Sequence, residues 1–144
     1  MSETAAAQSG ITVGFAVDGS GLVPSSAVGE EIGRYLEGQL SMPVKVRSFA
    51  AEAQLYNWLS NFHEVDAAWL SDDFLGGVPA GQLYSVARNL DDSPGLLHGE
   101  VVARQGLNPA VLEQVRLAFL KMHESAAGKV LLSQVNVSRF VSPQ

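Results

Sequence analysis

Apolar and polar or small residues alternate over residues 11–17 and again over residues 44–49, a period of two that indicates β-strands. The second stretch places valines on one face and Lys45 and Arg47 on the other, which favours a strand at the edge of a sheet. A third stretch, residues 65–70, is almost continuously apolar, as expected of a central parallel strand covered on both faces. The pattern therefore predicts three strands.

Apolar residues at helical spacing occupy the two intervals between these strands. They predict one helix that opens at Ser25 or Ser26 and ends near residue 40, and a second over about residues 51–62. Gly29, Gly33 and Gly38 weaken the first helix in isolation, and we expect two of them to allow close approach to a sheet. Strand, helix, strand, helix, strand is the pattern of right-handed βαβ units.

The pattern changes in the second half of the chain. Residues 72–81 contain three glycines and a proline and predict a loop or one short helical turn. Two extended segments follow at 83–90 and 97–104, and no helix fits between them. We therefore expect at least one of them to run antiparallel to the first three strands.

The end of the chain is predicted to be mainly helical. Asn108 followed by Pro109 is typical of a helix start, and apolar spacing continues this helix to about His123. Ser125 is expected to cap a shorter helix, and residues 135–141 are expected to be extended.

Together these elements predict an α/β fold, with a mostly parallel mixed sheet of about five strands and helices on both faces. The chain has 144 residues, which is enough for one hydrophobic core without disulfide or metal staples. We therefore expect a single domain over residues 11–144, preceded by a disordered segment over residues 1–10, which are small and polar.

Composition excludes several classes of protein. The absence of cysteine excludes disulfide frameworks, thiolate metal sites and thiol nucleophiles. A net charge of −6 with only nine Lys and Arg argues against a nucleic-acid or anionic-membrane surface. No apolar run approaches the roughly 20 residues that a membrane helix needs.

Two compartments remain open. The first ten residues lack the basic and apolar regions of a signal peptide, which indicates the cytoplasm. Alternatively, these ten residues are what remains of an exported protein whose signal peptide has been replaced by a Met. The protein would then be periplasmic.

Several short sequences occur in an order that resembles a known family. In the first half they are Ile-Thr-Val-Gly-Phe-Ala at 11–16, Arg-Tyr-Leu-Glu at 34–37, Met-Pro-Val-Lys-Val at 42–46 and Val-Asp-Ala-Ala-Trp-Leu at 65–70. In the second half they are Asp-Ser-Pro at 92–94, Val-Val-Ala-Arg at 101–104, Leu-Asn-Pro at 107–109 and Gly-Lys-Val-Leu-Leu at 128–132. This order resembles the substrate-binding proteins of phosphonate and phosphite ABC transporters, in the type II periplasmic-binding-protein superfamily.

The resemblance implies a single-lobe relative. Residues 11–81 resemble the start of the family's first lobe and residues 86–141 its far C-terminal part, while residues 83–86 stand where the family has its second lobe. Because the family's first lobe is built from both chain ends, we expect the two parts to close one complete α/β domain.

The expected ligand site lies beyond the carboxyl ends of the strands, where open α/β sheets bind ligands. The residues proposed to bind there are Asp18, Gly19, Ser20, Ser71, Asp72 and Asp73. Exposed N–H groups at the helix starts near Ser25 and Ala51 could hold an oxyanion. The alternative is that the 18–21 segment is only a turn and that Ser71 is only a helix cap.

The acidic side chains at this edge repel an anion, so Asp72 or Asp73 would more sensibly meet an amine on a phosphonate. No nucleotide fingerprint is complete, and Ala127 stands where a zinc-protease motif starting at His123 would need a second histidine. We therefore expect no cofactor, no metal site and no enzyme activity.

The predicted function is a non-catalytic binding module that takes a small oxyanion or phosphonate weakly. The alternative is a protein-interaction or assembly module, as a homodimer or docked on a partner, that has lost transport function. One lobe covers only one side of a small ligand, so binding is expected to be weak unless a second chain supplies the other wall.

Overall fold

The computed structural model describes residues 10–17, 23, 25–61, 64–79, 81–90, 99–135 and 137–142. The strands are β1 (Ile11–Ala16), β2 (Val44–Phe49), β3 (Ala67–Ser71), β4 (Leu83–Leu90), β5 (Gly99–Arg104) and β6 (Arg139–Val141). The helices are α1 (Ser26–Leu40), α2 (Glu52–Ser60), α3 (Asp72–Leu75), α4 (Pro109–Leu120), the 3-10 helix η2 (Met122–Glu124) and α5 (Ala126–Gln134). The segment expected to be disordered falls, apart from Gly10, outside the described residues.

The six strands form one mixed sheet in the order β2-β1-β3-β5-β4-β6. β1 pairs in parallel with β2 on one side and with β3 on the other. β5 then runs antiparallel to β3, β4 antiparallel to β5, and β6 antiparallel to β4. The expected mixed sheet, its antiparallel segment and the edge position of β2 are confirmed. The sheet is less parallel than expected, because three of the five described strand pairings are antiparallel, and the short β6 adds a sixth strand.

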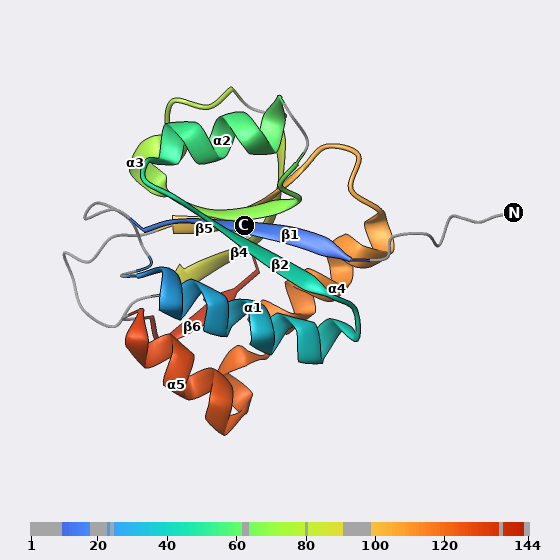
Figure 1. Cartoon of the computed structure of the whole chain (residues 1–144), viewed down its shortest axis with the longest axis vertical. Coiled ribbons are helices and arrows are strands. Elements are labelled where there is room, and N and C mark those ends of the chain that lie inside the picture. The colour runs from blue at the N-terminus through green and yellow to red at the C-terminus, as the bar shows by residue number, and fades with distance from the viewer. Residues whose placement is uncertain are drawn as a thin grey trace, which may run out of the picture.

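Helices cover both faces of the sheet, as predicted. α2 and α3 lie on one face, and α1, α4 and α5 lie on the other (Figure 1). Each face has its own core, the larger one under α1, α4 and α5. Phe140 of β6 closes this larger core, with its ring centroid 5.4 Å from that of Trp69 and 4.9 Å from that of Phe119.

The caps predicted from polar residues are present. The Oγ of Ser25 accepts from the N–H of Val28, the Oδ1 of Asn108 from that of Ala110, and the Oγ of Ser125 from that of Gly128. Two helices are shorter than expected: α2 ends at Ser60, and the chain tightens into η2 after α4 ends at Leu120.

A partly buried ion pair holds the parallel half of the sheet to the antiparallel half. Asp66, just before β3, is 9% exposed. Its carboxylate accepts from the N–H of Thr12 in β1 at 2.8 Å and from Nε of Arg104 in β5 at 2.8 Å. Its own N–H donates to the Thr12 carbonyl, and its carbonyl accepts from the Arg104 N–H. One residue thus joins three neighbouring strands.

A second arginine supports an irregularity in β4. The register of β4 against β5 shifts between Ser85 and Ala87, so one residue is left over at this β-bulge. Arg116 of α4 donates to the carbonyl of Val86 through Nε and to that of Ser85 through a terminal nitrogen, at 3.1 and 3.0 Å. The guanidinium therefore satisfies backbone acceptors near the bulge.

The glycines of α1 differ in their surroundings. A Cβ on Gly33 would overlap Cγ2 of Val46 in β2, and one on Gly29 would lie 3.1 Å from the ring of Phe15. A Cβ on Gly38 would meet nothing within 4 Å. The prediction that two of the three glycines allow close approach to the sheet is confirmed.

This difference predicts opposite effects of the same substitution in one helix. Gly38→Ala should stabilise the protein by about 0.5–1 kcal/mol, because alanine loses less backbone entropy and the site is open. Gly33→Ala should destabilise it by about 1–3 kcal/mol, because α1 must move away from β2. Urea unfolding of both variants measures the two effects, and equal effects would contradict the packing of α1 on β2.

Candidate functional site

The switch in strand order lies at β1. The chain passes from β1 through α1 to β2, and from β2 through α2 to β3 on the other side of β1. Because α1 and α2 lie on opposite faces of the sheet, the carboxyl ends of β1, β2 and β3 border the position where open α/β sheets bind ligands (Figure 1). We call this the carboxyl edge.

Half of the predicted site residues can be placed. Asp18, Gly19 and Ser20 lie outside the described residues. Ser71 is the last residue of β3 and is 4% exposed, while Asp72 and Asp73 form the first turn of α3. These three residues lie together at the carboxyl edge.

Ser71 is engaged by a carboxylate of the protein itself. Glu52, in the first turn of α2, accepts from the Ser71 N–H through Oε2 at 2.6 Å and from the Ser71 Oγ through Oε1 at 2.8 Å. The same Oγ accepts from the N–H of Phe74 at 3.2 Å, which caps α3. Ser71 is thus a helix cap, and Glu52 takes both of its donors, so neither is available to a ligand oxyanion.

Asp72 is engaged as well. Its Oδ2 accepts from Arg88 of β4 at 2.8 Å, and the other terminal nitrogen of Arg88 lies 3.3 Å from a carboxylate oxygen of Glu100 in β5. Arg88 and Glu100 are register partners across the two strands. Asp73 is exposed to solvent. Of the three predicted residues placed here, Asp73 is the one whose side chain is open to a ligand.

The described part of the carboxyl edge is therefore mainly acidic. Asp72 and Glu100 both contact the guanidinium of Arg88, while Glu52 is bonded to Ser71 and Asp73 is exposed to solvent. Arg88 and Glu100 were not among the residues predicted to lie at this edge. Both residues lie in segments that the sequence predicts to be extended, but the sequence does not show the register that brings them to Asp72.

No group of three or more metal-binding side chains gathers in the part of the chain that the structure describes. None of the described helices is both long enough and apolar enough to cross a membrane.

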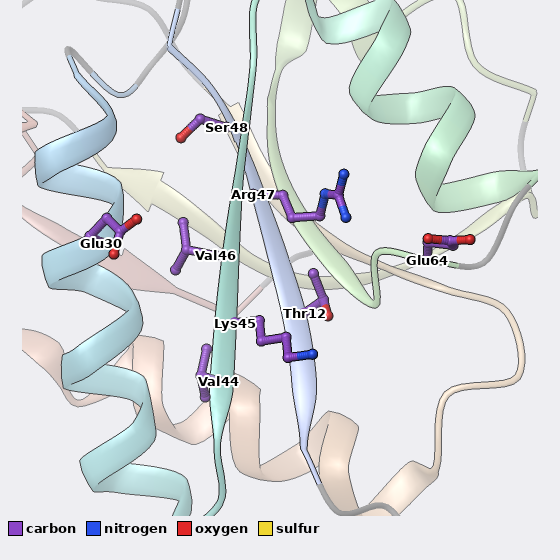
Figure 2. Close-up of a pocket in the computed structure, with 8 residues that line it drawn as sticks. All are labelled: Thr12, Glu30, Val44, Lys45, Val46, Arg47, Ser48 and Glu64. Carbon is purple, nitrogen blue, oxygen red and sulfur yellow. The ribbon is translucent and has the colours of Figure 1, made fainter.

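A hollow of about 740 Å³ lies elsewhere, along the edge strand β2. Its lining residues are Thr12, Glu30, Val44, Lys45, Val46, Arg47, Ser48 and Glu64. Figure 2 shows Lys45 and Arg47 extending to the side of Thr12 and Glu64, and Val44 and Val46 extending to the side of α1. A hollow of about 290 Å³ adjoins it at Lys45 and reaches Gly10 and Pro43.

Among the solved structures with a similar fold are XAC2383 from Xanthomonas citri bound to ATP and PhnD1 from Prochlorococcus marinus in complex with methylphosphonate. XAC2383 has a TM-score of 0.73 and 8% identity, over 94% of this chain and 92% of that chain. PhnD1 has a TM-score of 0.73 and 9% identity, over 94% of this chain and 93% of that chain. XAC2383 bound to chloride ion has a TM-score of 0.71 and 9% identity, over 94% of this chain and 92% of that chain. No family model and no curated protein matches the sequence.

These comparisons show the fold. The chain has a type II periplasmic-binding-protein-like fold, which confirms the fold expected from the resemblance. The described residues form a single sheet with helices on both faces (Figure 1).

The contacts of Glu52 predict that removal of its carboxylate lowers the stability of the protein more than removal of the nearby Asp73 carboxylate. Glu52→Ala should destabilise the protein by about 1–3 kcal/mol, because it leaves the N–H of the nearly buried Ser71 without an acceptor. Asp73→Ala, at an exposed position, should change stability by less than about 0.5 kcal/mol. Urea unfolding of both variants checks this, and a neutral Glu52→Ala would show that Glu52 does not hold β3 and α2 together.

Proposed function

We propose that this protein is a non-catalytic binding module that holds a small ligand at the carboxyl edge. The observation that carries the proposal is the fold: solved proteins of similar fold are described as bound to methylphosphonate and to ATP. The switch point at β1 supports the placement of the ligand, because a helix from each face of the sheet begins there.

Charge at this edge favours a ligand that carries both signs. The first turns of α2 and α3 contain Glu52, Asp72 and Asp73, whereas the first turn of α1 contains no acidic residue. An oxyanion is therefore best placed at the start of α1, where backbone N–H groups carry partial positive charge. An amine on the same molecule would meet the exposed Asp73. An aminoalkylphosphonate satisfies both requirements better than phosphate does.

A single lobe leaves one side of such a ligand exposed to solvent. Effective pockets bury most of a small ligand, so the lobe by itself should bind weakly. A second copy of the chain placed across the carboxyl edge would supply the missing wall. Binding should then be accompanied by dimerisation.

Titration calorimetry tests the choice of ligand. With 2-aminoethylphosphonate we expect saturable heat, and with methylphosphonate, phosphite or phosphate weaker heat or none, because only the first ligand offers an amine to Asp73. Asp73→Asn should weaken 2-aminoethylphosphonate binding by about three- to tenfold and leave methylphosphonate binding unchanged.

Glu37→Gln, an exposed charge removal in the last turns of α1, is the matched control and should bind like the parent protein. The absence of heat with every one of these ligands at millimolar concentration would refute the proposed function. Equal loss in the two variants would show that Asp73 contributes only through net charge.

A further inference from the structure

The end strand β2 has an outer edge to which no described strand is paired. β2 pairs with β1 along its six residues and is the first strand in the order of the sheet. At the opposite end of the sheet β6 has only three residues. Of the two end strands, β2 therefore offers the longer backbone edge.

The pairing with β1 determines which backbone groups face outward. The N–H of Ile11 donates to the carbonyl of Pro43, and the N–H of Val17 to that of Phe49. Because backbone groups of successive residues point to opposite sides of a strand, the odd-numbered residues of β2 bond to β1. Val44, Val46 and Ser48 thus direct their N–H and C=O groups away from the sheet, in the spacing that another strand requires.

One side of this edge is basic. Lys45 and Arg47 are exposed and line the 740 Å³ hollow on the side of Thr12 (Figure 2). The guanidinium carbon of Arg47 lies 4.5 Å from the centroid of the Trp58 ring, which holds this side chain in place. Among the described residues neither Lys45 nor Arg47 forms an ion pair. Two cations thus stand side by side on a protein whose net charge is −6.

The side of the edge that faces α1 is apolar, and one acidic residue of α1 lies next to it. Val44 and Val46 lie toward α1, with Gly33 directly over Val46, and Glu30 of α1 lines the hollow above them (Figure 2). An incoming strand would meet valines on this side and cations on the other. Carboxylates on the α1 side would face Glu30 and be disfavoured.

From these observations we propose that β2 is a docking edge for an extended acidic segment of a partner protein, which adds a seventh strand to the sheet. The partner's main chain bonds to Val44, Val46 and Ser48, its carboxylates lie beside Lys45 and Arg47, and its apolar side chains lie beside the valines. This is strand addition, in which the backbone supplies affinity and alternate side chains supply specificity.

The same charges disfavour a second copy of the chain as the occupant. In an antiparallel pair about a two-fold axis through Val46, Lys45 of one copy would face Arg47 of the other. Like charges directly opposite each other across two strands are destabilising. The basic side chains therefore protect the edge from self-pairing and leave it open to an acidic strand.

The test uses a designed peptide, acetylated Val-Glu-Val-Glu-Val-Glu with a fluorescent label, and measures binding by anisotropy. We expect saturable binding that weakens with salt, and much weaker binding of the Val-Lys counterpart and of Val-Val-Val-Glu-Glu-Glu. The double variant Lys45→Glu/Arg47→Glu should lower affinity for the acidic peptide by about tenfold or more and favour the basic one. Lys121→Glu/Lys129→Glu, with the same change of charge at exposed positions beyond α4, should bind like the parent.

Methylation of the peptide backbone separates strand addition from simple charge attraction. In the alternating peptide, either the three Val residues or the three Glu residues direct their N–H groups to β2. N-methylation of that set should abolish binding, whereas N-methylation of the other set should largely preserve it. Amide chemical shifts in the NMR spectrum should move at Val44, Val46 and Ser48. Equal binding of both methylated peptides, no binding at millimolar peptide, or a dimer paired through β2 in sedimentation and NMR would each overturn the proposal. None of these outcomes depends on ligand binding at the carboxyl edge.

Discussion

The sheet depends on the ion pair of Asp66 with Arg104. To one side of Asp66 the strands are parallel and joined by crossover helices, and to the other side they are antiparallel. The two halves meet between β3 and β5, where Asp66 bonds to Thr12 and Arg104 through both its side chain and its main chain. A nearly buried carboxylate is retained here because both of its oxygens have donors. Removal of Arg104 would leave a nearly buried carboxylate with a backbone donor but no opposite charge, so the junction tolerates change poorly.

The parallel half of the fold could be predicted because its signals are local. Alternation indicates β1 and β2, continuous apolarity indicates β3, and Ser25 marks where α1 begins. Asn108 and Ser125 give the same local signal for α4 and α5, later in the chain. The resemblance to phosphonate-binding proteins then supplied the type of fold. β6 was expected only as an extended segment, because three residues carry too little periodicity to indicate a strand partner.

The candidate site was harder to predict because it depends on register. Ser71, Asp72 and Asp73 follow a buried strand and could be placed at the carboxyl edge from order alone. The finding that Glu52 takes the donors of Ser71 follows from how α2 packs on β3. The bond from Arg88 to Asp72 depends on the register between β4 and β5, which is shifted at a bulge. A pattern of residue types does not determine either arrangement.

Phe140 has a consequence for the order in which the chain folds. It lies against Trp69 and Phe119, and its strand pairs with β4, about fifty residues earlier in the chain. During synthesis, β1, α1, β2, α2 and β3 can therefore form their local units while Trp69 still lacks one of its neighbours. The indole would become fully buried only when β6 pairs with β4 and Phe140 packs against it. The fluorescence of Trp69, once separated from that of Trp58, would thus report a long-range step of folding, and contacts of this separation are the slow ones.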